Sequence, residues 1–234
     1  MKAKKIYIIN NEGYKISGIL HLAENKNLII ICNGYDSTKE FSSIKLLAEE
    51  LSKKGYNVFR FDFSGTGESE GPKNVFINQQ VEDLNSIVNY FKHFNKINIL
   101  GGSLGALSAS IVSIINSKIS GLITVNGFFG TSKLGKEVRK TYFLYRLLTF
   151  INRNHRLDYR FFKNNFLPEK IKIPVLVIYS EDDNVINPIQ SLDFFSKLKT
   201  KNKKPLSLTL KKHDLTGKGD VNKVVESVFN WYKD

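Results

Sequence analysis

The strongest constraint on this chain is an alternation of short β-rich apolar runs with stretches of helical periodicity, which repeats through most of its 234 residues. Such alternation is typical of βαβ units built around a largely parallel sheet. We predict one α/β domain whose mostly parallel central sheet is flanked by helices. The runs that predict its strands span 4–10, 14–23, 27–34, 56–63, 97–100, 121–127, 173–180 and 205–210.

The flanks of these runs predict the first connections. The first two runs lie on either side of Asn11-Glu12-Gly13, a turn signal, and predict an antiparallel hairpin. After the third run, Ser37 can cap a helix that ends at Gly55. Further helices are expected within 75–94, from the small-residue stretch 101–115, and at the C-terminus, where Val224, Val225, Val228, Phe229 and Trp231 form the apolar side.

One region interrupts the alternation. Residues 128–170 lack a convincing strand pattern, mix basic with aromatic side chains and have a helical character. This composition predicts a small helical cap inserted after the sixth strand, with 1–127 and 171–234 forming the core. Because open α/β sheets bind ligands at the carboxyl ends of their strands, we expect the cap to lie over that edge.

The segment Gly101-Gly102-Ser103-Leu104-Gly105 follows a predicted strand and leads into a predicted helix. It fits Gly-x-Ser-x-Gly, and a strand–turn–helix context is what a nucleophile elbow requires. Glycines on both sides of the serine allow a sharp turn that lifts its hydroxyl above the sheet edge. We therefore take Ser103 as the candidate nucleophile.

A serine hydroxyl needs a base and an orienting acid to become a good nucleophile. The chain has four histidines, and His213 is the best placed of them because it follows the last predicted strand. For the acid, the run Ser180 to Asn184 comes directly after a predicted strand. Asp183 is the preferred member of this run and Asp182 the second choice.

The serine, acid and histidine appear in the order of the α/β-hydrolase superfamily, which the sequence resembles over nearly its whole length. The family's Asp-x-x-Gly-x-Gly-x-Ser segment stands here at 62–69, and the resemblance implies that Asp62 holds that loop. The acid segment resembles Gly-x-x-Asp-x-x-Val-Pro, which selects Asp183. Within the superfamily, the chain resembles the cinnamoyl (feruloyl) esterase and monoacylglycerol-lipase-like branch.

The resemblance also implies an oxyanion hole built from the backbone N–H groups of Tyr35 and Leu104. The chain departs from the family pattern at two points. Asn33 precedes Gly34 where the family usually has histidine, and Lys212 precedes His213 where a small residue is usual.

These features predict a serine hydrolase that cleaves carboxylic esters of small or medium acyl groups through an acyl-enzyme. A peptidase or thioesterase with the same triad is the alternative, as is a non-catalytic binding protein of the same fold. No cofactor or metal is expected. One cysteine, Cys32, provides no thiolate cluster, and no Gly-Lys-Ser/Thr or complete dinucleotide motif is present.

The charge of the chain bears on its partners. The formal net charge is +13, and nearly all of the excess lies in the second half. The basic cap would allow weak contact with an anionic membrane surface, although an amphipathic cap with solvated cations explains it as well. We expect no nucleic-acid binding, because the lysine run near 197–204 lacks interleaved aromatics. The N-terminal stretch lacks a signal-peptide core, so we expect a cytoplasmic protein.

Overall fold

The protein is described from a computed structural model, which covers residues 2–72, 76–130, 153–211 and 213–233. Eight strands form one sheet in the order β1-β2-β4-β3-β5-β6-β7-β8. The strands are β1 Lys2–Ile9, β2 Lys15–Leu22, β3 Asn27–Cys32, β4 Asn57–Phe61, β5 Lys96–Gly102, β6 Ile119–Val125, β7 Val175–Tyr179 and β8 Lys203–Ser207. The described helices are α1 Ser42–Lys53, α2 Ile77–Tyr90, α3 Leu104–Ile115, α5 Arg153–Asn165, the 3-10 turn η1 Pro168–Lys170, α6 Ile189–Lys197 and α7 Gly217–Trp231.

The sheet is parallel from β4 to β8, while β1 and β2 pair antiparallel with each other and β2 pairs antiparallel with β4. The predicted N-terminal hairpin is therefore confirmed. Gly13 occupies the left-handed region at φ +85° in its turn. The mostly parallel sheet predicted from the alternation is also present.

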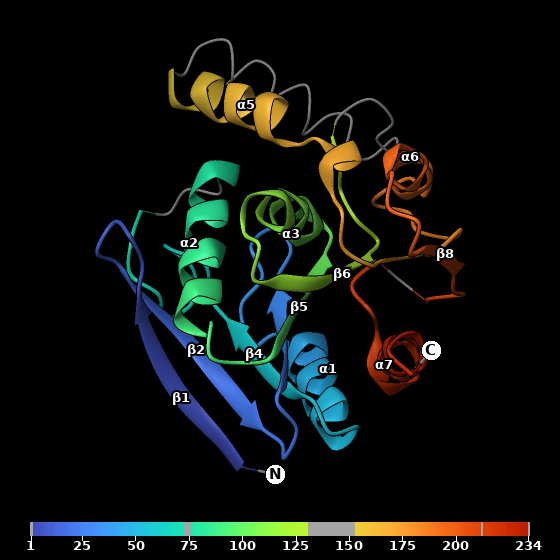
Figure 1. Cartoon of the computed structure of the whole chain (residues 1–234), viewed down its shortest axis with the longest axis horizontal. Helices are drawn as coiled ribbons and strands as arrows, with labels where there is room; N and C mark the ends of the chain where they lie inside the picture. The colour runs from blue at the N-terminus through green and yellow to red at the C-terminus, as the bar shows by residue number, and fades with distance from the viewer. Residues whose placement is uncertain (1, 73–75, 131–152, 212, 234) are drawn as a thin grey trace.

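Helices cover both faces of the sheet, with α1 and α7 on one side and α2 and α3 on the other (Figure 1). In β3, Ile29 and Ile31 pack toward α1 and α7, while Leu28 and Ile30 pack toward α2 and α3. Burial on both faces explains why this strand is a continuous apolar run rather than an alternating one.

The strand order creates a crevice at the carboxyl ends of β3 and β5. The chain leaves β3 through α1 on one face to reach β4, and it leaves β5 through α3 on the other face to reach β6. Adjacent parallel strands whose connections diverge in this way form a topological switch point, where open α/β sheets bind ligands. The loop after β3 and the turn at Ser103 meet there.

The helix expected from Ser37 begins only at Ser42, so that prediction is wrong at its start. The N–H of Lys39 donates to Asp62 Oδ1 at 2.6 Å, and its carbonyl accepts from Arg60 Nη1. In a helix that began at Ser37, this carbonyl would accept an intrahelical hydrogen bond, and here Arg60 takes its place. Helix α6 was not predicted from the sequence.

The described part of the predicted cap consists of 128–130 and 153–170. Helix α5 lies there against α2, with Asn78 N–H donating to Asp158 Oδ1 at 3.0 Å. Figure 1 shows α5 across the ends of α2 and α3. The rest of the cap, 131–152, lies outside the described residues, so the cap and the domain boundaries remain predictions.

Candidate active site

Ser103 lies at the turn between β5 and α3 with φ +50° and ψ −122°. A positive φ is unfavourable for a residue with a Cβ and persists only where the surroundings hold it. Here the Ser103 N–H donates to Val125 O at 3.0 Å, and its carbonyl accepts from Phe128 N–H at 2.9 Å. The end of β6 and the segment after it thus hold Ser103 on both sides in its strained conformation.

The two glycines of the Gly-x-Ser-x-Gly pattern are required by close backbone approach. A Cβ at Gly105 would lie 2.4 Å from the carbonyl oxygens of Cys32 and Asn33, and one at Gly101 would lie 2.7 Å from Ala106 Cα. A Cβ at Gly102 would have no heavy atom within 4 Å. Glycine is therefore needed at the two flanking positions of the pattern and not at the position just before the serine.

His213 and Asp183 form the hydrogen-bonded pair predicted from the sequence. The His213 Nδ1 to Asp183 Oδ2 distance is 2.7 Å, and the two side chains are 8% and 1% exposed. The other carboxylate oxygen, Oδ1, accepts the N–H groups of Val185 and Ile186 at 2.8 and 2.9 Å. Asp182, the second choice, is exposed, so the structure selects Asp183. A neutral imidazole that donates through Nδ1 keeps Nε2 free as an acceptor.

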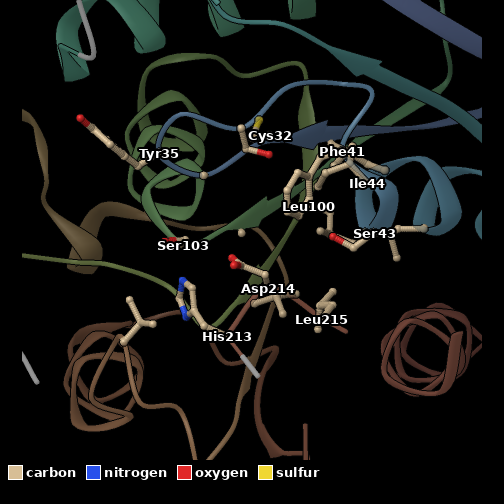
Figure 2. A pocket seen from close by; sticks show the side chains of 17 residues that line it. Cys32, Tyr35, Phe41, Ser43, Ile44, Leu100, Ser103, His213, Asp214 and Leu215 are labelled. Carbon is tan, nitrogen blue, oxygen red and sulfur yellow. The ribbon is translucent and has the colours of Figure 1, made fainter. Parts of the chain in front are cut away.

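Ser103 and His213 line one cavity of about 290 Å³. Figure 2 shows both side chains on the wall of this cavity. Within the described part of the chain, no hydrogen bond joins Ser103 to His213. The remaining lining is mainly apolar and comes from the loop after β3, from α1 and from the strand ends. None of the described residues of 128–170 contributes to it. The lining includes Ile31, Phe41, Ile44, Leu47, Leu100, Val125, Val185 and Leu215.

The two residues predicted to provide the oxyanion donors lie next to the nucleophile turn. The Leu104 N–H is the first of α3, and a Cβ at Gly34 would lie 3.1 Å from Ser103 Cβ, which places the loop carrying Tyr35 against the serine. Within the described chain, neither the Tyr35 nor the Leu104 N–H has an acceptor. The Tyr35 side chain is 70% exposed and points away from Ser103 (Figure 2), so only its backbone is available for this role.

Asn33, which replaces the family's usual histidine, has a structural role. Its side chain is fully buried, and Nδ2 donates to Phe61 O at 2.7 Å, so it ties the loop after β3 to β4. Its Oδ1 is buried with no partner in the described structure. The departure therefore preserves the path of the loop that carries the Tyr35 N–H.

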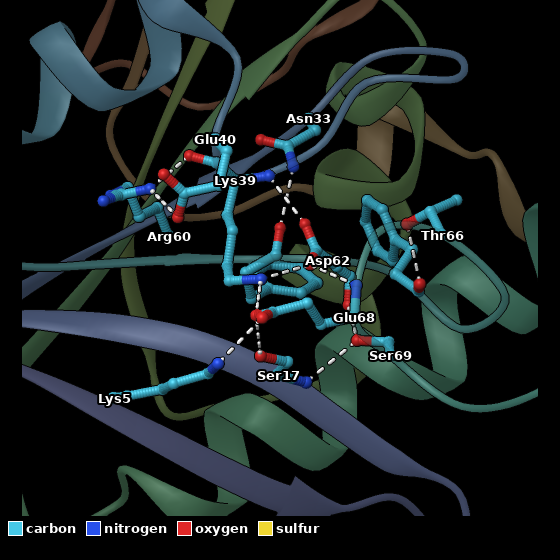
Figure 3. Close-up of polar contacts among 12 residues, drawn as sticks. Lys5, Ser17, Asn33, Lys39, Glu40, Arg60, Asp62, Thr66, Glu68 and Ser69 are labelled. Carbon is cyan, nitrogen blue, oxygen red and sulfur yellow. Dashed lines mark hydrogen bonds and ion pairs between the residues drawn. The ribbon is translucent and has the colours of Figure 1, made fainter.

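The carboxylate of Asp62 holds the neighbouring loop, as predicted (Figure 3). Its Oδ2 accepts the Glu68 N–H at 2.9 Å and the Lys39 ammonium at 2.5 Å. Lys39 also contacts the Glu68 carboxylate at 2.6 Å, and this contact, with a second from Lys5, lowers the pKa of Glu68 to about 2. Lys39 and Asp62 are 1% and 0% exposed, so the pair is a buried anchor for the loops beside Ser103.

Two of the other histidines are engaged elsewhere. His21 accepts from Arg60 Nε at 3.1 Å on β2, and burial, followed by the Arg60 charge, lowers its pKa. His93 packs its ring against Phe91 and Phe94. The side chain of His155 lies outside the described residues. Across the described ranges, no group of three or more His, Cys, Asp or Glu residues is placed to hold a metal ion.

Lys39 and Asn126 were not predicted from the sequence as residues of the site. Asn126 follows β6 directly, and its side chain contacts Ser180 N and His213 O. The sequence offers one signal for Asn126, a polar residue directly after a buried apolar strand and next to Gly127. Lys39 gave no such signal, because a lysine in a polar loop is expected to be solvated.

The mostly parallel sheet, the strand–serine–helix turn and the adjacent His–Asp pair define the α/β-hydrolase class of fold. The chain belongs to the Hydrolase_4 family, described as serine aminopeptidase, S33, whose profile matches residues 23–160. That span includes Ser103 and ends before Asp183 and His213. Among curated protein sequences, none matches the chain.

Solved structures agree with this assignment. The Pyrococcus furiosus esterase Pf2001 superposes with a TM-score of 0.79 at 21% identity, covering 99% of this chain and 92% of that one. Est1E from Butyrivibrio proteoclasticus, solved with ferulic acid bound, has a TM-score of 0.78 at 19% identity, covering 97% of both chains. Mouse alpha/beta hydrolase domain-containing protein 10 has a TM-score of 0.78 at 15% identity, covering 98% of both. The α/β-hydrolase fold predicted from the sequence is therefore confirmed. No helix in the described ranges is long and apolar enough to span a membrane.

Proposed function

We propose that the protein is a serine hydrolase that cleaves carboxylic esters through Ser103, His213 and Asp183. The observation that carries this proposal is a strained serine and a histidine on the wall of one mainly apolar cavity, with the histidine bonded behind the wall to the buried Asp183. A structural serine has no need of a left-handed backbone or of an adjacent histidine with a free Nε2. Membership of a hydrolase family supports the same reading.

In the proposed mechanism, His213 Nε2 takes the proton of Ser103 as Oγ attacks the ester carbonyl carbon. The N–H groups of Tyr35 and Leu104 stabilise the negative charge that develops on the carbonyl oxygen. Asp183, held by two backbone N–H groups, orients the imidazole and stabilises its cation. The tetrahedral intermediate collapses, and the alcohol leaves with the proton from His213.

The acyl group then remains bound to Ser103 Oγ until water attacks it. His213 takes a proton from this water, and the acid is released as Ser103 recovers its proton. The same groups therefore serve as base and acid in both halves of the cycle. No other group is needed to balance the reaction.

The cavity supports small or medium acyl groups as substrates. Its volume of about 290 Å³ lies at the lower end of ligand pockets, and its apolar lining favours an uncharged hydrocarbon acyl chain. A thioester or a peptide passes through the same tetrahedral intermediate, so these substrates are the alternatives to test. A binding protein without turnover is the remaining alternative.

The experiment is hydrolysis of p-nitrophenyl esters graded from acetate to decanoate, together with labelling by a fluorophosphonate, which reacts with activated serines. Ser103→Ala should abolish both, by several orders of magnitude in kcat/KM. Ser110→Ala is the matched control, because Ser110 is a buried serine on α3, the helix that follows Ser103, and its hydroxyl donates to Ala106 O.

The outcomes separate the alternatives. Turnover that survives Ser103→Ala would refute the proposal. Labelling of Ser103 without ester turnover would indicate that the substrates are thioesters or peptides. Neither labelling nor turnover in the wild-type protein would indicate a non-catalytic member of the fold.

A further inference from the structure

Asn126 lies at the junction of the segments that carry Ser103, Asp183 and His213. It follows β6 directly, is 3% exposed, and its backbone N–H donates to Ile178 O at 3.0 Å. On either side of it, Val125 and Phe128 bond the N–H and the carbonyl of Ser103. The backbone around Asn126 is therefore fixed to β7 and to the nucleophile turn.

The side-chain amide of Asn126 bridges two further loops. Its Oδ1 accepts the N–H of Ser180, the first residue after β7 on the way to Asp183, at 3.0 Å. Its Nδ2 donates to the carbonyl of His213 at 3.3 Å. Since a backbone N–H only donates and a carbonyl only accepts, these partners fix the amide orientation. Aspartate provides no donor for the carbonyl, and leucine provides neither group.

Asn126 also has a left-handed backbone, with φ +47°. This region is unfavourable for residues with a Cβ, and asparagine tolerates it better than most. The position thus requires both a tolerant backbone and an amide, a combination that only asparagine provides among the standard residues of this size.

His213 is held at two points. Its imidazole bonds Asp183, and its backbone carbonyl bonds Asn126. Without the contact from Asn126, the imidazole would still bond Asp183, but the backbone of His213 would lose the hydrogen bond that fixes its carbonyl. The second contact therefore governs where Nε2 lies relative to Ser103.

We propose that Asn126 is a positioning residue, which sets the place of His213 relative to Ser103 by tying the histidine backbone to the loop that carries Asp183. This inference rests on the proposed function. Asn126 does not touch the substrate or the reacting atoms, so its loss should lower kcat and leave KM nearly unchanged.

Two variants distinguish the role of the Asn126 side-chain amide from that of its backbone conformation. Asn126→Gly keeps the left-handed conformation and removes both side-chain hydrogen bonds. Asn126→Asp keeps the acceptor for Ser180 N–H and places a carboxylate oxygen against the His213 carbonyl. A misplacement of about 1 Å can cost about 100-fold in rate, so we expect kcat to fall about 10- to 100-fold in both variants.

The pH profile provides a second readout. A carboxylate at position 126 adds a negative charge near the His213 imidazole, and a nearby negative charge stabilises a positive one. The acidic limb of the kcat profile should therefore move to higher pH in Asn126→Asp. It should stay in place in Asn126→Gly, which adds no charge. A fall of kcat in both variants, with the acidic limb moving only in Asn126→Asp, therefore separates the lost positioning of His213 from the effect of the added charge.

Asn116 offers a matched control at the opposite end of α3 from Ser103. It is also buried, its Oδ1 accepts Lys118 N–H at 3.0 Å, and its Nδ2 donates to Asn85 Oδ1 at 2.7 Å. Asn116→Asp therefore makes the same chemical change to a bridging amide without touching the His213 loop. Its kcat should remain at the wild-type value.

The test measures ester kcat and KM, the pH profile, and the rate of fluorophosphonate labelling of Ser103, below the melting temperature of each variant. Slower labelling and lower kcat in both Asn126 variants, with Asn116→Asp unchanged, support the proposal. Wild-type labelling rates and kcat in a folded Asn126→Gly or Asn126→Asp overturn it. If the wild-type protein itself neither labels nor turns over ester, the proposed function fails instead.

Discussion

Replacing Gly105 with alanine should destabilise the protein, whereas replacing Gly102 should not. The added Cβ at position 105 would lie 2.4 Å from two carbonyl oxygens, Cys32 O and Asn33 O. Both are backbone atoms of β3 and the loop after it, so no side chain can rotate away. Helix α3 or the end of β3 must shift by nearly 1 Å to restore ordinary contact. That shift would also disturb the loop that carries the Tyr35 N–H.

Overpacking of this kind typically costs about 1–3 kcal/mol. A domain of 150–250 residues loses about 2–4 °C in Tm per kcal/mol, so we expect Gly105→Ala to melt about 2–12 °C below the wild-type protein. The better helix propensity of alanine, up to about 1 kcal/mol in a helix interior, offsets only a fraction of this cost because residue 105 lies in the first turn of α3. Gly102→Ala meets no heavy atom within 4 Å and should stay within about 0.5 kcal/mol.

The assay is thermal unfolding followed by circular dichroism at 222 nm, with urea unfolding to give the free energy of unfolding. Gly102→Ala is the control for adding one methyl group to the same pattern. Equal Tm values for the two variants, or a lower Tm for Gly102→Ala, would refute the explanation of the motif by backbone approach.

Four further predictions follow from the same geometry. Asp183→Asn should lower kcat by about 10⁴-fold, because the imidazole of His213 would lose its correct tautomer. Asp182→Asn should retain activity. Equal losses of kcat in the two variants would contradict the assignment of Asp183 as the acid. Because the pKa of His21 is lowered from 6.5, protonation favours the unfolded chain, so wild-type stability should fall as pH drops below 6.5. His21→Gln should weaken that fall between pH 7.5 and 5.5 in urea titrations, and an unchanged slope would disprove it. Asp214 is the one carboxylate in the described lining of the cavity, and it should repel a substrate that carries a second carboxylate. Asp214→Asn should therefore raise kcat/KM for a p-nitrophenyl adipate monoester about 3- to 10-fold relative to the hexanoate at low salt. An equal change for both esters would argue against a charge effect. If the basic cap contacts membranes, the protein should sediment with liposomes that contain anionic lipid and not with neutral ones. Identical sedimentation with both kinds of liposome would contradict this contact.

Local patterns in the sequence were sufficient to predict the strands, the class of fold and the nucleophile turn. The run Asn27–Cys32 is apolar at nearly every position because both faces of the sheet are covered. The glycines at 101 and 105 stand where a Cβ would collide with neighbouring backbone. Periodicity and steric exclusion act over a few residues, so they are visible without the fold.

Contacts between distant loops were decided only by the tertiary structure. The strand order brings the His213 loop to Asp183 rather than to its exposed neighbour Asp182. It also brings Arg60 to the Lys39 carbonyl, so that α1 starts only at Ser42. It places Asn126 between two loops far from it in sequence. The sequence by itself determined the strands, most of the helices and the nucleophile motif. Which polar groups meet at the sheet edge depends on how the strands are ordered, because buried donors and acceptors take their partners from whatever the topology brings within reach.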